Sequence, residues 1–135
     1  MVEIDIAYQG NLHTSCRHGP SGRQLETDAP LDNQGRGESF SPTDLLATAL
    51  GTCMLTVMGI AARRQGLRFD AAQSRVEKYM VADPVRRVGR LVVRFELPAG
   101  FAPEARTMLE EAARTCPVQQ SLHPEIETEL IFCWK

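Results

Sequence analysis

Residues 41–66 read SPTDLLATALGTCMLTVMGIAARRQG, and this stretch decides the fold. No charge occurs from Leu45 to Ala62, a run of 18 residues with one cysteine, Cys53, near its middle. Such a run can be a membrane span or the core helix of a soluble protein. Two glycines and three threonines dilute its hydrophobicity, and the chain has no second run of this kind. We therefore expect a core helix and no membrane span.

Both ends of this helix carry recognisable signals. Ser41 is a favourable N-cap, and Pro42 suits the first helical position, where its missing N–H group costs nothing. Asp44 lies three residues after Ser41, close to a capping-box arrangement and favourable to the helix dipole. Gly66 is a typical terminator. The sequence therefore predicts a long helix over residues 42–65.

Composition narrows the class of protein. A chain of 135 residues is long enough for one domain with a real core, so we expect a single domain over residues 1–135. The net charge is −2 and the basic residues are scattered, which predicts no nucleic-acid partner. The start, MVEIDIAYQG, lacks the features of a signal peptide, so we expect a cytoplasmic protein.

The segments around the long helix have the pattern of strands and one further helix. Residues 2–9 alternate apolar and polar side chains, as in a half-buried strand, and RHGPSGRQL reads as a turn with strand on either side. We expect strands over 72–81 and 88–97, a helix over 103–115, and a closing strand in EIETELIFCWK. The order β-β-α-β-β-α-β is typical of an α+β fold rather than alternating α/β.

This layout has too little sheet to cover a helix that is apolar on all sides. Five or six short strands supply one sheet, which covers one face of the helix. The other face needs a second layer, and a second copy of the chain is the simplest source. We therefore expect a homodimer with the long helices at its centre.

The four cysteines predict chemistry rather than a disulfide scaffold. Cys133 lies in the closing strand and is read as structural. Cys16 and His18 can face the same way on a strand, but a metal site needs three or four ligands, so a turn-flanking pair is the favoured reading. Cys53 and Cys116 each lie at an apolar helix position, where a cysteine is often simple packing. Each of the two helices carries one of these cysteines, so packing of the helices could bring the sulfurs into contact.

Two segments carry a resemblance to a known family. FSPTDLLATALGTCMLTVMGIAARRQG, followed by CPVQQSLHPEIE, resembles the OsmC/Ohr family of osmotically inducible and organic hydroperoxide resistance proteins. The match covers nearly the whole chain, and TDAPLDNQGRGESFSPTDLL is most similar to the general OsmC-like branch. The resemblance implies an intertwined homodimer in which the long helix packs between sheets, with a site at each end of the interface.

The resemblance also implies a mechanism. Cys53 would be the peroxidatic thiolate, which becomes a sulfenic acid, and Cys116 would be the resolving thiol that condenses with it into a disulfide. An external dithiol, of the lipoyl type in the family, would restore both thiols, and no bound cofactor or metal is implied.

Activation of the Cys53 thiol requires a cation or hydrogen-bond donors, because only the thiolate attacks and apolar surroundings disfavour it. In peroxidase members an arginine held by a glutamate supplies the charge. Thr43 stands at the position of that glutamate, so Asp44 or Glu38 would take its role. Arg17 or Arg36 would supply the cation, with Arg17 slightly favoured for its place beside a strand end.

The remaining polar candidates have simpler readings. His18 could replace the arginine but is expected to be exposed, and His123 is expected to be a turn histidine. Apolar side chains of the long helix, Leu50, Met54 and Met58, are expected to be core packing unless a cavity lies beside them.

These features predict a thiol-dependent peroxidase that reduces small organic hydroperoxides and defends against oxidative stress. An apolar pocket around Cys53 would favour alkyl hydroperoxides, since burial contributes about 0.8 kcal/mol per CH₂. The alternative is a dimer of the same family that binds a small apolar ligand or senses oxidation without significant turnover. The replaced acidic position, Thr43, motivates that alternative.

Overall fold

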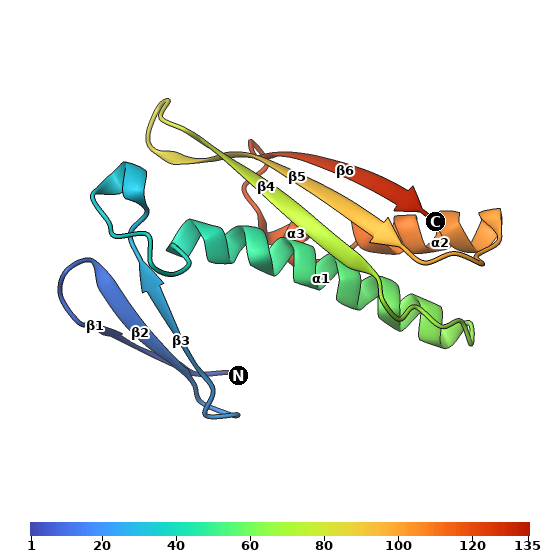
Figure 1. The fold of residues 1–135 in the computed structure, drawn as a ribbon, viewed down its shortest axis with the longest axis horizontal. Helices are drawn as coiled ribbons and strands as arrows, with labels where there is room; N and C mark the ends of the chain where they lie inside the picture. The colour runs from blue at the N-terminus through green and yellow to red at the C-terminus, as the bar shows by residue number, and fades with distance from the viewer. The chain divides into compact units, whose positions relative to one another are not determined.

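The computed structural model describes all residues, Met1–Lys135, and divides into two compact units. Residues 1–46 form the first unit and residues 47–135 the second. The long helix α1, Pro42–Arg64, begins in the first unit and continues into the second (Figure 1). That the whole chain forms a single domain stays a prediction.

The first unit is an antiparallel three-stranded sheet. Its strands β1 (Ile4–Tyr8), β2 (His13–His18) and β3 (Gln24–Asp28) pair in the order β1-β2-β3. A short 3₁₀ helix, η1 (Leu31–Asn33), follows. The predicted order has two strands before the helix, and the structure corrects it to three. The turn between β2 and β3 lies within the predicted turn and includes Gly22 with a φ of +71°.

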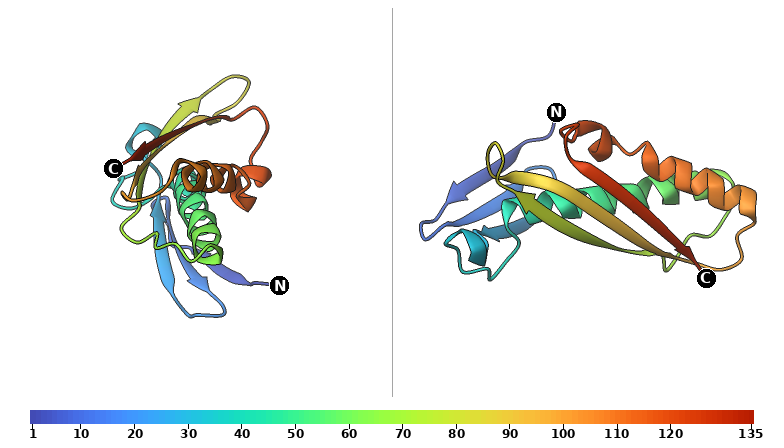
Figure 2. Two further views of the ribbon diagram at one scale, coloured as in Figure 1. Left: turned by 90° about the vertical axis from the view of Figure 1, so that its right-hand side faces the viewer. Right: turned by 90° about the horizontal axis from the view of Figure 1, so that it is seen from above.

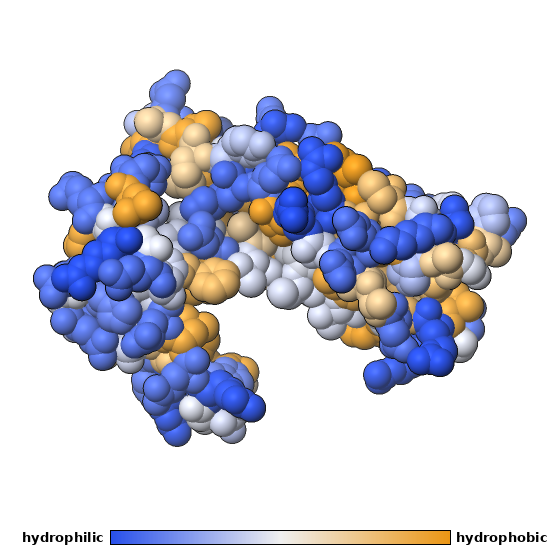
Figure 3. Space-filling model, in the orientation of Figure 1, coloured by the Kyte–Doolittle hydropathy of each residue, from blue (hydrophilic) through white to orange (hydrophobic).

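Strand β1 confirms the predicted strand but not its predicted burial. Every residue of β1 is exposed, and Ile6 retains 68% of its accessible surface. Val2, Ile4 and Tyr8 are exposed as well. The alternation predicts an apolar face, yet a single chain provides no layer to cover it. Hydrophobic surface is visible over this sheet in the view of Figure 3.

Helix α1 begins with a reciprocal capping box. The main-chain N–H of Ser41 donates to Asp44 Oδ2 at 2.9 Å, and that of Asp44 donates to Ser41 Oγ at 3.1 Å. Two of the orphan donors of the first turn are thereby satisfied. At the other end Gly66 adopts a φ of +68°, and the N–H of Leu67 donates to the carbonyl of Ala62 at 2.9 Å. The helix therefore starts at the predicted residue, Pro42, and ends at Arg64, one residue before the predicted end.

The second unit contains a mixed sheet of three strands, β4 (Gln73–Val81), β5 (Arg87–Leu97) and β6 (Glu127–Trp134). Strands β4 and β5 are antiparallel, whereas β5 and β6 are parallel. The parallel pair is joined by a crossover that contains α2 (Pro103–Arg114) and α3 (Pro117–Ser121). Figures 1 and 2 show α2 and the second-unit part of α1 on the same face of this sheet.

One face of α1 supplies the core of the second unit. Its buried residues recur at helical spacing and are Ala47, Leu50, Gly51, Met54, Met58 and Ala62. Gly51 lies so close to β4 that an added Cβ would be 2.8 Å from Val76 Cγ2. The opposite face is exposed at Thr48, Thr52, Thr56 and Ile60. Length and composition alone would let α1 cross a membrane, but core helices of soluble proteins pass the same test.

Candidate functional site

Two cysteines from different elements meet in the second unit. Cys53 lies at the middle of α1 and is half-buried, and Cys116 lies between α2 and α3 and is 0% exposed. Their side chains lie close enough to interact, and neither cysteine is in a disulfide. The predicted meeting of the two helix cysteines therefore occurs in the structure.

The local sequence explains the placement of Cys116. Pro117 cannot continue α2, so the chain turns at Cys116, which becomes the N-cap of α3 with an extended backbone conformation. The main-chain N–H of Gln119 donates to Cys116 Sγ at 3.3 Å. A cysteine sulfur thus takes the position that Ser, Thr or Asp commonly takes at helix starts.

The surroundings of Cys116 favour its protonated form. Burial raises the pKa of the Cys116 thiol, and the Cys53 thiol beside it raises that pKa as well. The main-chain N–H groups of Gln119 and Val118 oppose this shift, since they stabilise the thiolate. The structure therefore favours the protonated thiol at Cys116.

Arg17, one of the two predicted activating arginines, lies in β2. It is paired across the strands with Asp5 of β1, and the two side chains form an ion pair at 4.0 Å. Both side chains are well exposed. An exposed pair of this kind contributes little to stability.

Arg36 and Glu38 line one pocket of about 330 Å³ in the first unit. The same pocket is lined by His13 and Asp28. His13 Nδ1 lies 2.6 Å from Asp28 Oδ1, and the main-chain N–H of Glu38 donates to Asp28 Oδ2 at 3.1 Å. Two predicted candidates are therefore brought together, beside a His–Asp pair that the sequence analysis did not single out.

The strand register brings His13 and Asp28 together. His13 and Asp28 stand at the ends of two strands that are separated by a short turn, so antiparallel pairing places them opposite each other. Only the strand register reveals this relationship, and no sequence pattern around His13 indicates it.

Asp44 and Thr43 lie in the first turn of α1. Asp44 closes the capping box with Ser41, and Thr43 Oγ1 lies 3.2 Å from Ser41 Oγ. These contacts account for the acidic residue at this position in structural terms. An additional role for Asp44 at the thiol stays a prediction.

The other polar candidates have local partners. His18 Nδ1 lies 2.6 Å from Ser21 Oγ, and His123 Nδ1 accepts from the N–H of Glu125 at 3.1 Å, as expected of turn histidines. Cys133 is exposed in β6. No group of three His, Cys, Asp or Glu side chains is arranged to hold a metal ion. Leu50, Met54 and Met58 are fully buried, which confirms them as core residues.

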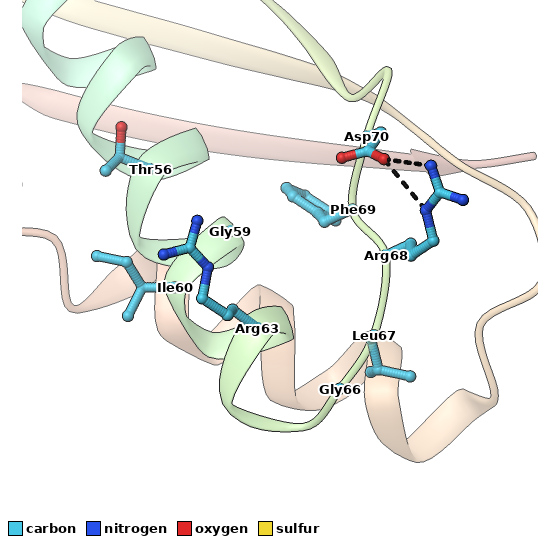
Figure 4. Close-up of a pocket in the computed structure, with 9 residues that line it drawn as sticks. All are labelled: Thr56, Gly59, Ile60, Arg63, Gly66, Leu67, Arg68, Phe69 and Asp70. Carbon is cyan, nitrogen blue, oxygen red and sulfur yellow. Dashed lines mark hydrogen bonds and ion pairs between the residues drawn. The ribbon is translucent and has the colours of Figure 1, made fainter.

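A pocket of about 480 Å³, lined by both apolar and charged side chains, lies at the C-terminal end of α1 (Figure 4). Ile60, Leu67 and Phe69 give it an apolar lining. Arg68 also lines it and is bound to Asp70 at 2.9 Å, as the dashed lines of Figure 4 mark. Arg63 contributes a guanidinium that forms no ion pair. The pocket combines an apolar lining with a free cation.

Residues 35–131 match the family model described as OsmC-like protein. Among curated proteins, none matches the sequence significantly.

Several solved structures are similar to the chain over nearly its full length. One, from Psychrobacter arcticus 273-4, is named for osmotic stress induction and a detoxification response; it is 42% identical, with a TM-score of 0.93 over 98% of this chain and 96% of that one. An organic hydroperoxide resistance protein of Legionella pneumophila is 16% identical, with a TM-score of 0.79 over 98% and 96%. The organic hydroperoxide resistance protein OhrB of Bacillus subtilis is 12% identical, with a TM-score of 0.74 over 98% of each chain. The last two comparisons concern the fold alone.

Proposed function

Because the chain belongs to the OsmC-like protein family, we propose that it is a thiol-dependent peroxidase that reduces organic hydroperoxides. The observation that carries the proposal is the contact between Cys53 and Cys116. One sulfur is half-buried and the other is fully buried, so a substrate reaches Cys53 first.

The proposed reaction runs through the two sulfurs in turn. The Cys53 thiolate attacks the distal oxygen of the hydroperoxide, the O–O bond breaks, the alcohol leaves, and Cys53 becomes a sulfenic acid. The sulfur of Cys116 then attacks Cys53, an S–S bond forms, and the sulfenic oxygen leaves as water with the proton of the Cys116 thiol. An external dithiol is oxidised as it reduces this disulfide back to two thiols.

The protonation state of Cys116 supports this division of roles. Burial keeps Cys116 as a thiol, so it does not compete for the hydroperoxide. Arg17 or Arg36 supplies the positive charge for the Cys53 thiolate in this proposal, and Glu38 or Asp44 orients that arginine. The pocket shared by Arg36 and Glu38 supports this pair, whereas Arg17 has Asp5 as its partner.

We also propose that the working form is a cytoplasmic homodimer. Two apolar surfaces of a single chain support it: the face of β1 with Ile4 and Ile6, and Ile60 on the exposed face of α1. Surfaces of this kind commonly mark protein interfaces. Light scattering should give a mass of twice 15.0 kDa, and a monomeric mass would contradict the dimer.

Intact-mass analysis with one equivalent of cumene hydroperoxide tests the peroxidase proposal. Wild-type protein should rapidly lose two hydrogens, and peptide mapping should locate a Cys53–Cys116 disulfide. Cys53→Ser should abolish peroxide consumption, while Cys116→Ser should stop at a sulfenic acid that dimedone traps. Cys133→Ser is the matched control and should behave as wild type. Unchanged consumption by Cys53→Ser would refute the proposal.

The second candidate function is binding of a small apolar ligand without significant turnover. The pocket of Ile60, Leu67 and Phe69 favours it, since its lining suits an apolar molecule and Arg63 suits an acidic group on that molecule. This reading expects slow, unspecific oxidation of the cysteines together with saturable binding of a fatty acid. Loss of that binding in Ile60→Asp would support it.

A further inference from the structure

A chain of two hydrogen bonds connects the sulfur of Cys116 to strand β6. The main-chain N–H of Gln119 donates to Cys116 Sγ at 3.3 Å. The side chain of the same Gln119 donates through Nε2 to Thr128 Oγ1 at 3.1 Å. Thr128 stands opposite Leu91 in the parallel pairing of β5 and β6. The buried sulfur is thereby tied to a strand of the sheet.

The hydrogen bond from Gln119 to Thr128 fixes helix α3, which has little stability of its own. Helix α3 has five residues, and a helix of this length is not stable by its own hydrogen bonds. Pro117 begins it, and its last residue is followed by a loop up to β6. The position of Cys116 Sγ therefore depends on what fixes α3, and the bond from Gln119 to Thr128 is a direct link to the sheet.

A second observation concerns the two polar atoms of the Gln119 side chain. Its Oε1 is buried and has no hydrogen-bond partner, whereas its Nε2 is bonded to Thr128. A buried carbonyl without a partner is unfavourable. An apolar side chain of similar length would avoid that cost, so stability alone does not explain a glutamine here.

We propose that Gln119 and Thr128 are positioning residues for the resolving thiol. Together they hold Cys116 Sγ against Cys53 so that it attacks the sulfur of Cys53 as soon as that sulfur carries a leaving group. The inference deepens the proposed function, because resolution of the Cys53 sulfenic acid is one case of this attack. Holding a nucleophile at its target is a large source of rate in an intramolecular reaction.

The same attack occurs with a simple disulfide and without any hydroperoxide, which gives an independent test. In a Cys16→Ser, Cys133→Ser background, Cys53 attacks 2,2′-dithiodipyridine and forms a mixed disulfide, with release of one thiopyridone. Cys116 then attacks the sulfur of Cys53, the mixed disulfide breaks, and a second thiopyridone leaves. Stopped-flow absorbance resolves the two releases, and the second one reports the positioning of Cys116.

Thr128→Val and Thr128→Ser form the matched pair for this test. Valine keeps the shape of threonine without its hydroxyl, and serine keeps the hydroxyl. We expect the first release to be unchanged in both and the second release to be roughly three- to tenfold slower in Thr128→Val only, the size expected for one lost hydrogen bond. Equal second phases in the two variants would overturn the inference.

Gln119→Met separates positioning from stability and serves if Thr128→Val does not fold. It removes the bond to Thr128 and also the unpaired Oε1, so its unfolding midpoint should stay near that of wild type. Its second release should nevertheless be slowed as in Thr128→Val. A wild-type second phase in Gln119→Met would refute the role of Gln119.

The outcome is distinct from that of the peroxidase proposal. If wild-type protein reacts in two phases with the dithiodipyridine but does not consume cumene hydroperoxide, the peroxidase proposal fails and the positioning role stands. The opposite result is also distinguishable. Here the protein consumes hydroperoxide while Thr128→Val and Thr128→Ser give equal amounts of dimedone-trapped sulfenic acid. In that case the positioning role fails and the peroxidase proposal stands.

Discussion

The imidazole of His13 donates a hydrogen bond from Nδ1 to the carboxylate of Asp28, at 2.6 Å, and Asp28 is only 4% exposed. The second oxygen of that carboxylate accepts from the N–H of Glu38. His13 therefore neutralises a buried charge that also holds the segment with Arg36 and Glu38 beside the β1–β3 sheet.

This pair predicts that the first unit weakens at alkaline pH. Asp28, and then Glu26, raise the pKa of His13 above the ordinary histidine value of about 6.5. A raised folded-state pKa means that the contribution is fully present below about pH 6.5 and is lost as the pH rises through the folded-state pKa. In thermal melts from pH 5 to pH 9, wild type should have a higher melting temperature than His13→Gln at low pH. This difference in melting temperature should shrink as the pH rises. His123→Gln is the control, and a difference that grows with pH would contradict the prediction.

Gly51→Ala should destabilise the second unit. The new Cβ would lie 2.8 Å from Val76 Cγ2 and 3.3 Å from Ser74 Oγ, so α1 and β4 must move apart. We expect a loss of about 1–3 kcal/mol in the free energy of unfolding. Gly59→Ala is the matched control: its Cβ would approach Phe69 only to 4.0 Å, and better helix propensity should stabilise it by about 0.5–1 kcal/mol. Urea unfolding measures both, and equal effects would contradict the packing argument.

The capping box at the start of α1 should show coupling between its two residues. Ser41→Ala and Asp44→Ala each remove one side-chain acceptor and should each cost about 1 kcal/mol. Their contacts form one reciprocal unit, so the double variant should lose less than the sum of the single losses. A double-mutant cycle by urea unfolding measures this coupling, and strictly additive losses would show that the two bonds act independently.

Glu110→Ala should loosen the packing of α2 on β6. Glu110 Oε1 accepts from Trp134 Nε1 at 2.9 Å, and the indole ring also contacts Phe101 with ring centroids 5.3 Å apart. Loss of the acceptor should cost about 1 kcal/mol and shift the tryptophan emission to longer wavelength. Trp134 is the only tryptophan of the chain, so the tryptophan emission reports the surroundings of this one residue. Glu110→Gln keeps an acceptor, so it should preserve both the stability and the emission wavelength of wild type.

The elements predicted from sequence are those with strong local signals. Helix α1 starts at Pro42 and is followed by Gly66 because N-cap, proline and glycine preferences act over a few residues. The alternation in β6 correctly predicts its faces: Thr128, Leu130 and Trp134 are partly buried while Glu129 and Cys133 are exposed. Helix α3 was missed, since a five-residue turn after a proline has no periodic pattern.

Relationships that depend on tertiary structure could not be predicted in the same way. The contact of Cys53 with Cys116 was anticipated because each helix carries one cysteine, but the bond of Gln119 to Thr128 depends on how α3 meets β6. Ile6 is an example of a residue whose burial is predicted from sequence but is not found in the single chain. An alternating pattern predicts that a strand has an apolar face, and it does not tell which layer covers that face.

The parallel pairing of β5 and β6 determines when the two sulfurs can become neighbours during biosynthesis. Cys116 belongs to the crossover between these strands, so its anchored position requires the last strand to be docked. A ribosome releases Cys53 well before that strand, so a nascent chain carries the proposed nucleophile without its proposed resolving partner. Oxidised at that stage, Cys53 would proceed toward sulfinic acid or capture a foreign thiol. Under the proposed mechanism, reversible thiol chemistry is thus a property that the chain would acquire only with its final strand.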